Sequence, residues 1–163
     1  MKNKQLKYIK AEDKDDELLT STAVNSKKYW GYPDEQMDLW KTDDLQVTKE
    51  YIKKNQVYKV YDQSNFIGFY GIFKKENDTW EIDHLWLTTD NIRKGYGTII
   101  FKHILTELFK KDAKKAILIA EPNAKVFYDK MGGKVIGEFQ SKISGRFLDL
   151  YEFSIEMKSS IST

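Results

Sequence analysis

The sequence has 163 residues, of which 40% are hydrophobic and 32% charged, and its formal net charge at pH 7 is +2. These proportions are typical of a folded domain with a sizeable core, and the charge is too small to indicate a nucleic-acid partner. Cysteine is absent, which excludes disulfides, thiolate zinc sites and a cysteine acyl-enzyme.

Neither a targeting segment nor a membrane partner is expected. The first ten residues, MKNKQLKYIK, lack the apolar stretch of a signal peptide. The aliphatic run at residues 116–120 is far too short to cross a bilayer. A chain without cysteine also fits a reducing compartment. We therefore expect a cytoplasmic protein that forms one domain, residues 1–163.

The N-terminal third predicts one strand followed by helices. Residues 6–11 fit a short strand. Residues 13–28 are helix-prone, with Asp13 as a candidate N-cap and acidic residues in the first turn. A second helix can begin at Asp34, and residues 48–52 fit a further helical turn.

An aromatic segment, Tyr-Trp-Gly-Tyr-Pro, separates the first two predicted helices at residues 29–33. Aromatic side chains bring large buried areas, so Trp30 and Tyr32 fit a role in core packing. They fit equally an aromatic wall for a substrate. The sequence leaves both interpretations open.

From Gln56 the hydrophobic period changes from helical spacing to alternation. Residues 57–61, 66–73 and 79–87 each read as a strand, and short polar turns join them. Successive strands with such short connections form an antiparallel meander.

A long apolar helix pattern covers residues 98–108, and a buried-looking strand follows at residues 115–120. Because a whole helix separates this strand from residues 79–87, the two strands should be parallel neighbours with a right-handed crossover.

The C-terminal region predicts one more helix and a strand pair. The helix covers residues 124–131 and ends at Gly132. Residues 135–139 and 147–157 read as a closing antiparallel pair. The tail, residues 159–163, is expected to fray.

A glycine turn, Arg-Lys-Gly-Tyr-Gly-Thr at residues 93–98, precedes the long helix. Gly95 and Gly97 allow a ligand to approach the backbone. The first N–H groups of the helix, with Arg93 and Lys94, favour an anion such as a pyrophosphate. A tight turn without any ligand is the alternative, because Gly-x-Gly alone is a weak motif.

The order of these parts, together with Asn-Ala-Lys-Val-Phe-Tyr-Asp-Lys-Met-Gly at residues 123–132, resembles the GNAT superfamily of N-acetyltransferases over most of the chain. The resemblance implies an α/β fold of the α+β type. Its mixed, mostly antiparallel sheet would have six to seven strands, with splayed central parallel strands and helices on both faces. One departure is Ile92, which stands where the family usually has Gln or Arg. Arg93 and Lys94 could supply the missing cation.

The resemblance implies acetyl-CoA as cosubstrate and no metal. The residues expected to contact it are Trp86, Leu87, Thr88, Arg93, Lys94, Gly95, Tyr96, Gly97, Thr98, Asn123 and Lys130. A backbone N–H near Leu87 would stabilise the oxyanion. Asn123 could instead cap the helix that follows it.

Acetyl transfer to an amine requires a base, because a lysine-like amine with a pKa of about 10.4 arrives protonated at neutral pH. By family position Glu81 is the first candidate, and Asp83 shares its strand face. His84 lies on the opposite face and has a suitable ordinary pKa. Water alone is a further possibility. By the same resemblance Tyr128 would be the acid that protonates the departing thiolate.

Arg146 follows Ser144 and Gly145 in a turn that resembles one near the acceptor cleft of some GNAT members. Its planar guanidinium would suit an acceptor carboxylate or phosphate, although a surface ion pair is an equal alternative. The acceptor is expected to be a primary amine on a small molecule or peptide. The chain would act as a monomer or a homodimer. A non-catalytic CoA-binding or protein-interaction domain is the alternative function, and a nucleotide-binding domain is a third.

Overall fold

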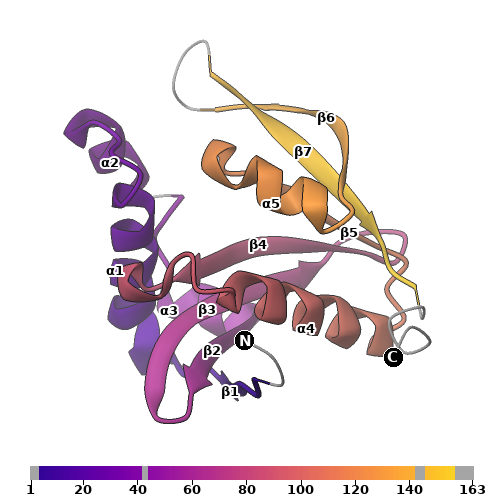
Figure 1. The fold of residues 1–163 in the computed structure, drawn as a ribbon, viewed down its shortest axis with the longest axis horizontal. Coiled ribbons are helices and arrows are strands. Elements are labelled where there is room, and N and C mark those ends of the chain that lie inside the picture. The colour runs from indigo at the N-terminus through magenta and orange to yellow at the C-terminus, as the bar shows by residue number, and fades with distance from the viewer. Residues whose placement is uncertain (1–3, 42–43, 142–145, 157–163) are drawn as a thin grey trace. The chain divides into compact units, whose positions relative to one another are not determined.

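The structure, a computed structural model, describes residues 4–41, 44–141 and 146–156. Figure 1 shows the chain as a ribbon, coloured by residue number. The chain forms two compact units. The first unit consists of Met1–Ile72 and His84–Gly97. The second unit consists of Phe73–Asp83 and Thr98–Thr163. Two elements, strand β4 (Thr79–Leu87) and helix α4 (Tyr96–Lys110), each contribute residues to both units.

Within the described residues, seven strands form one sheet in the order β1-β2-β3-β4-β5-β7-β6. They are β1 (Lys7–Lys10), β2 (Gln56–Asp62), β3 (Asn65–Lys74), β4, β5 (Lys115–Ile119), β6 (Lys134–Gln140) and β7 (Phe147–Ser154). Strands β4 and β5 are parallel, whereas β1–β2, β2–β3, β5–β7 and β6–β7 are antiparallel. The mixed, mostly antiparallel sheet and its parallel pair confirm the expected fold class.

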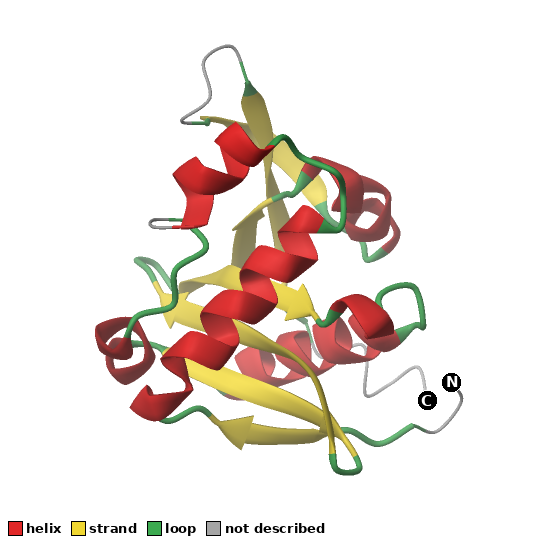
Figure 2. Cartoon of the chain, turned by 90° about the vertical axis from the view of Figure 1, so that its left-hand side faces the viewer, coloured by secondary structure: helices red, strands yellow, loops and turns green. Residues whose placement is uncertain are grey.

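Helices and short 3-10 turns connect the strands, as Figure 2 shows by colour. The helices are α1 (Asp16–Lys28), α2 (Asp34–Lys41), α3 (Lys49–Lys54), α4 and α5 (Lys125–Lys130). The 3-10 turns are η1 (Asp13–Asp15), η2 (Thr89–Asn91) and η3 (Pro122–Ala124). In the described ranges, no helix combines the length and the apolar composition needed to cross a membrane.

The start of the first helical segment differs from the sequence prediction, because Asp13 is not its N-cap. Glu12 occupies that position, and its N–H donates to Oδ2 of Asp15 at 2.8 Å. Asp15 is buried and also pairs with Nζ of Lys59 on β2, at 3.2 Å. Asp15 thus takes part both in a local capping box with Glu12 and in an ion pair with a distant strand.

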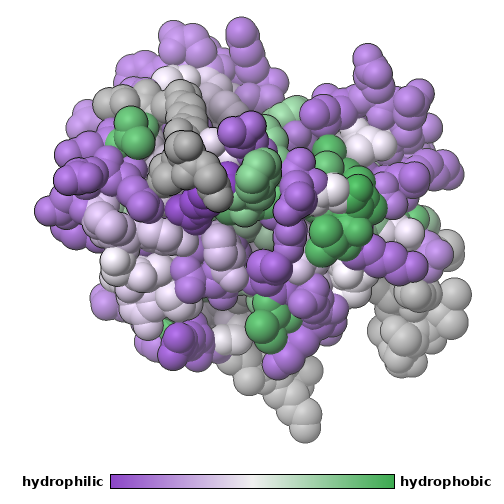
Figure 3. Space-filling view, turned by 90° about the horizontal axis from the view of Figure 1, so that it is seen from above, coloured by the Kyte–Doolittle hydropathy of each residue, from purple (hydrophilic) through white to green (hydrophobic). Residues whose placement is uncertain are grey.

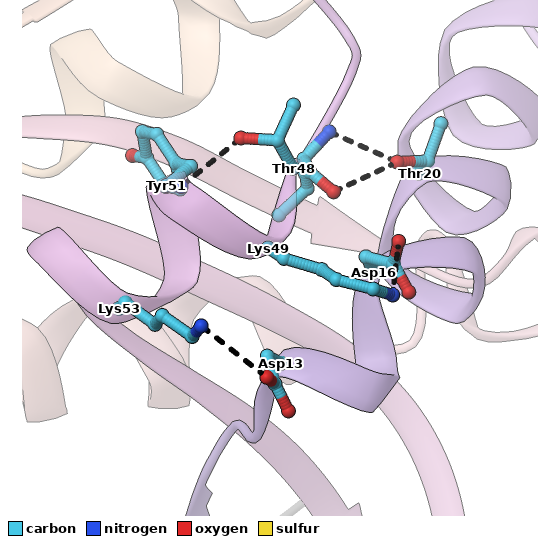
Figure 4. A network of polar contacts seen from close by, with 8 residues as sticks. Asp13, Asp16, Thr20, Thr48, Lys49, Tyr51 and Lys53 are labelled. Carbon is cyan, nitrogen blue, oxygen red and sulfur yellow. Dashed lines mark hydrogen bonds and ion pairs between the residues drawn. The ribbon is translucent and has the colours of Figure 1, made fainter.

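In the first unit, α3 is attached to α1 and η1 by polar contacts (Figure 4). Lys49 and Lys53 pair with Asp16 and Asp13, at 2.9 and 3.6 Å. The Thr20 hydroxyl accepts a hydrogen bond from the backbone N–H of Val47 at 2.9 Å. The buried side of α1, which includes Leu19 and Ala23, belongs to the apolar core.

In the second unit, the parallel register of β4 and β5 is short. It runs from Thr79 opposite Lys115 to Glu81 opposite Ile117. Residues 82–83 of β4 lie beyond its last pair, as do residues 118–119 of β5. The two strands are therefore not paired along their whole length.

The described surface carries hydrophobic side chains in separate patches. Figure 3 shows one such face, on which hydrophilic residues surround the patches. Strand β6 stands last in the strand order and exposes Val135, Ile136 and Phe139 by about half. The last strand of the chain, β7, lies between β5 and β6 and is not an edge of the sheet. Whether the chain is a monomer or a homodimer stays a prediction.

Candidate functional site

The glycine turn lies in the first unit, where η2 leads into α4. Arg93 and Gly95 both adopt left-handed backbone conformations, with φ of 68° and 87°. This region is readily available to glycine but uncommon for arginine. Gly95 is exposed, Gly97 is half-buried, and α4 begins at Tyr96 between them. The turn is therefore open to a ligand rather than sealed beneath side chains.

Cationic side chains border this turn. Arg93 and Lys94 are both exposed, as is Gly95 beside them. The first N–H groups of a helix lack acceptors within it, and the helix dipole adds partial positive charge there. Backbone and side chains thus favour an anion at the same place. Ile92, the departure from the family pattern, is half-buried next to the two cations.

Arg93 also contacts the aromatic segment that follows α1. Its guanidinium carbon lies 5.6 Å from the ring centroid of Trp30, a distance at which cation–π attraction is effective. A residue predicted to bind the cofactor thus touches one predicted to bind the substrate. Trp30 is half-buried and Tyr29 packs edge-on against it, with ring centroids 5.0 Å apart.

Tyr32 has a different environment. Its ring packs edge-on against Trp40, and Nζ of the buried Lys27 lies over both rings, 4.8 Å from Tyr32 and 4.3 Å from Trp40. These contacts favour the core-packing interpretation for Tyr32. Its predicted substrate contact stays a prediction.

The C-terminal end of β4 also belongs to the first unit. The residues at this end, Trp86, Leu87 and Thr88, are half-buried. Part of each is therefore accessible to a ligand. The backbone N–H of Thr88 already donates to the carbonyl of Ile67 at 2.9 Å. The backbone N–H of Thr88 is therefore already used within the fold and is not free to bind pantetheine. The role of the Leu87 N–H as oxyanion donor stays a prediction.

His84 is buried in the first unit. Its Nδ1 accepts a hydrogen bond from the Trp86 indole at 3.0 Å, which requires an unprotonated Nδ1. The rings of Tyr51 and Phe69 pack around the imidazole, with centroids 5.3 and 5.7 Å away. This packing favours a structural role for His84 over a role as the base that accepts a proton from the substrate.

Glu81 and Asp83 occupy the opposite face of β4, in the second unit. Burial raises the pKa of Glu81 above its ordinary 4.5, the charge of Asp83 raises it further, and Lys75 opposes both. Nζ of Lys75 lies 3.4 Å from Oε1 of Glu81. A half-buried carboxylate with a raised pKa is a better proton acceptor than an ordinary one. Of the predicted bases, Glu81 has the environment that suits this role best.

Tyr128 lies on α5 and is buried in an aromatic cluster of the second unit. Burial raises the pKa of its phenol, and the nearby charge of Glu121 adds to the increase. The surrounding rings, with centroids 5.2 to 6.3 Å away, are those of Phe101, Phe127, Tyr151 and Phe153. The phenol is therefore held protonated and can donate a hydrogen bond at neutral pH.

Asn123 and Lys130, also on the second unit, are both exposed. Asn123 does not cap the helix by itself, because Glu121 is the N-cap of η3. Oε1 of Glu121 accepts from the backbone N–H and the side-chain amide of Asn123, at 3.2 and 2.7 Å. Asn123 is thus oriented by Glu121, a residue that the sequence analysis did not single out.

Arg146 is half-buried, and its backbone carbonyl accepts a hydrogen bond from Ser141 at 2.9 Å. Ser144 and Gly145, the rest of the predicted turn, lie outside the described residues. Among the residues described, no group of three or more His, Asp or Glu side chains could hold a metal ion.

A cavity of about 600 Å³ lies elsewhere in the first unit, between α1 and the segment that leads into α3. Polar side chains dominate its lining, including the Asp16–Lys49 pair drawn in Figure 4. None of the predicted site residues lines it. The cavity is therefore distinct from the candidate site.

Comparison with known proteins identifies the family. The model of the acetyltransferase (GNAT) domain matches residues 31–149. Among solved structures, the chain is similar to the PaiA N-acetyltransferase of Thermoplasma acidophilum in complex with coenzyme A, with a TM-score of 0.72 and 21% identity over 92% of this chain and 99% of the other. It is also similar to the ribosomal-protein-S18-alanine N-acetyltransferase of Escherichia coli, with a TM-score of 0.69 and 13% identity over 94% and 96%.

A third similar structure is a Bacillus subtilis acetyltransferase in complex with CoA, with a TM-score of 0.68 and 16% identity over 93% of this chain and 100% of the other. At such identities the structural likeness shows the fold. A search of curated proteins found no match. The family match covers more than half of the chain, on the expected fold, and so this chain belongs to the GNAT acetyltransferase family and is an acyltransferase.

Proposed function

We propose that the chain is an N-acetyltransferase that moves the acetyl group of acetyl-CoA to a primary amine by direct attack in a ternary complex. The observation that carries the proposal is the open glycine turn at the start of α4, with its exposed Gly95 and adjacent cations. Two of the structurally similar proteins are complexes with coenzyme A, which supports this choice of cosubstrate.

In this proposal the backbone N–H groups of residues 95–98 bind the diphosphate, and Arg93 and Lys94 add positive charge. These groups are fixed before binding, so little ordering entropy is lost. The N–H of Leu87 donates to the acetyl oxygen as negative charge develops on it. The turn thus binds charge that the cosubstrate already carries, whereas the N–H of Leu87 acts on charge that develops only in the transition state.

Glu81 acts as the base, directly or through water. It takes a proton from the ammonium form of the acceptor, whose nitrogen lone pair then forms the new C–N bond. As the C–S bond breaks, the nitrogen loses its second proton to water, and Tyr128 donates a hydrogen bond to the departing thiolate. Because burial raises the phenol pKa, complete proton transfer to a thiolate is uphill, and hydrogen-bond donation is the main contribution of Tyr128.

Direct attack is favoured over an acyl-enzyme, since the sequence contains no cysteine to carry the acetyl group. The acceptor class follows less directly. One similar structure is named a ribosomal-protein-S18-alanine N-acetyltransferase, so peptides that carry an alanine amine belong in the first set of amines to be tested.

Thermal unfolding with acetyl-CoA, CoA and ATP, each added separately, tests the proposal. A ligand at about 100 times its dissociation constant adds roughly 2.7 kcal/mol to the free energy of unfolding. We expect this shift with acetyl-CoA and CoA only. A shift with ATP alone would instead favour a nucleotide-binding domain.

A thiol-release assay over a panel of amines then separates catalysis from binding. We expect acetyl-CoA to release CoA faster with at least one amine than without any. Cofactor binding with no release over a panel of small amines, peptides and protein lysines would favour the non-catalytic alternative.

A further inference from the structure

The glycine turn is tied to the β2–β3 hairpin by one phenol. Tyr96, the first residue of α4, is only 7% exposed, and its hydroxyl lies 2.5 Å from Oδ2 of Asp62 at the end of β2. Nζ of Lys4 lies 2.9 Å from the same oxygen. Two donors therefore meet one carboxylate, in what we call the Tyr96–Asp62–Lys4 anchor.

The acceptor in this anchor is a carboxylate. A hydrogen bond to an ionised acceptor is roughly twice as strong as a neutral one. The hydrogen bond from Tyr96 lowers the pKa of Asp62, and the bond from Lys4 lowers it further. The same bond raises the pKa of Tyr96. Both shifts describe one state, with the proton on the phenol and the charge on the carboxylate.

The turn needs such an attachment because its backbone is unusual. Arg93 holds a left-handed φ, which costs free energy for a residue with a side chain and persists only where the surroundings enforce it. Residues 93–95 are exposed and bury no side chain of their own. Tyr96 is the buried side chain next to them, so its fixed position constrains the end of the turn.

The anchor is also compatible with an anion at the turn. A carboxylate close to a diphosphate would repel it, but the length of the tyrosine side chain separates Asp62 from the backbone N–H groups. Lys4 compensates the charge of Asp62 directly, with side chains 33% and 13% exposed. The carboxylate of Asp62 thus binds the Tyr96 hydroxyl, and Lys4 neutralises its charge.

We infer that Asp62 is a positioning residue for the cosubstrate: by holding the Tyr96 hydroxyl, it fixes the direction of the backbone N–H groups at residues 95–97. This inference rests on the proposed function, since it concerns the same turn. It adds Asp62, which lies 34 positions from Tyr96 in the sequence and does not touch the cosubstrate.

Isothermal titration with CoA and with pantetheine, which lacks the diphosphate, tests the inference. Tyr96→Phe removes the donor and Asp62→Asn removes the charge, while both keep the side-chain shape. We expect each to weaken CoA binding about tenfold, the effect of losing a charged hydrogen bond. Pantetheine affinity should stay within about twofold, because its contacts lie elsewhere. The double variant should be no weaker than Tyr96→Phe alone, since both substitutions act on the same hydrogen bond.

Asp38→Asn is the matched control. It removes the carboxylate of another aspartate–lysine pair, in which Lys41 lies 3.5 Å from an Asp38 side chain that is 72% exposed. CoA affinity should not change in this variant. Urea midpoints of all variants show whether each is folded.

Three results overturn the inference. CoA affinities within about twofold of the unmodified chain in both anchor variants would show that the anchor does not position the turn. An equal loss for CoA and pantetheine would mean general structural damage. If the unmodified chain binds no CoA, the proposed function itself fails and the inference falls with it, whereas the first two results leave that function intact.

Discussion

Burial raises the pKa of two side chains in the second unit, Glu81 and Tyr128. The consequences for their proton chemistry are opposite. For the carboxylate, a raised pKa means a stronger base once ionised. For the phenol, it means a weaker acid that remains protonated over the whole physiological range. The proposed division of labour therefore assigns proton removal to Glu81 and hydrogen-bond donation to Tyr128.

Tyr128→Phe should lower turnover by roughly 10²-fold, because it removes the donor to the departing thiolate and leaves the aromatic ring in place. CoA release with a reactive amine measures the effect. Tyr151→Phe is the control: its ring is 5.8 Å from that of Tyr128, and it loses a hydroxyl that donates to Asp129 at 2.7 Å. Equal turnover in the Tyr128 variant and the unmodified chain would remove Tyr128 from the mechanism.

Glu81→Gln should abolish the acidic limb of the pH–rate profile. With Glu81 present, turnover should fall as the pH drops through a pKa above 4.5. At neutral pH the variant should be slower by about 10²-fold. Glu76→Gln, at an exposed position of the β3–β4 turn, serves as the control and should keep the limb. An unchanged limb in the Glu81 variant would point to water or another base.

The same pKa shift predicts a stability effect of definite sign. The native state binds the Glu81 proton more tightly than the unfolded state, so ionisation of Glu81 destabilises the fold. This cost is absent below pH 4.5 and develops as the pH rises through the raised native pKa. Glu81→Gln should therefore gain stability relative to the unmodified chain as the pH increases through that window, which urea unfolding at several pH values measures.

At the scale of elements, the end of β4 depends on a close approach by β3. A Cβ built on Gly68 would lie 2.2 Å from the carbonyl oxygen of Trp86, which is backbone and cannot rotate away. Thr88 N–H bonds to Ile67 beside this contact. Glycine at position 68 thus permits the strand geometry next to the predicted oxyanion donor, Leu87.

Gly68→Ala should destabilise the chain by about 1–3 kcal/mol, since β3 and β4 must move apart to admit the methyl group. Urea unfolding measures the change. Gly137→Ala on β6 is the control, because its nearest neighbour, Cδ2 of Leu150, is 4.0 Å away. A Gly68 variant as stable as the Gly137 variant would show that the approach of the two strands is not tight in solution.

At the scale of the whole molecule, the two units share continuous elements. Strand β4 contributes residues 79–83 to the second unit and residues 84–87 to the first. We therefore propose that the chain unfolds as one domain. Trp40 in the first unit and Trp80 in the second, each retained alone in a variant with the other three tryptophans replaced by Phe, should report the same urea midpoint. Two separate midpoints would contradict this proposal.

Several site features followed from local sequence. The glycine turn was recognised because Gly-x-Gly precedes a long apolar helix pattern, and backbone N–H groups at a helix start do not depend on distant partners. Glu81 and Asp83 were placed on one strand face by the two-residue period alone, and the structure shows that arrangement. His84 was placed on the other face, but its partner Trp86 and its packing against Tyr51 could not be foreseen.

Chain order, hydrophobic period and turn residues determined the family, the mixed sheet and the positions of the candidate groups, because these signals depend on neighbours within a few residues. Tertiary structure alone decided which groups share an environment. Asp15 pairs with Lys59 on a distant strand, burial raises the pKa of Glu81, and Asp62 accepts a hydrogen bond from Tyr96. Each of these effects depends on contact between residues far apart in sequence or on burial away from water. A local sequence pattern specifies neither of them.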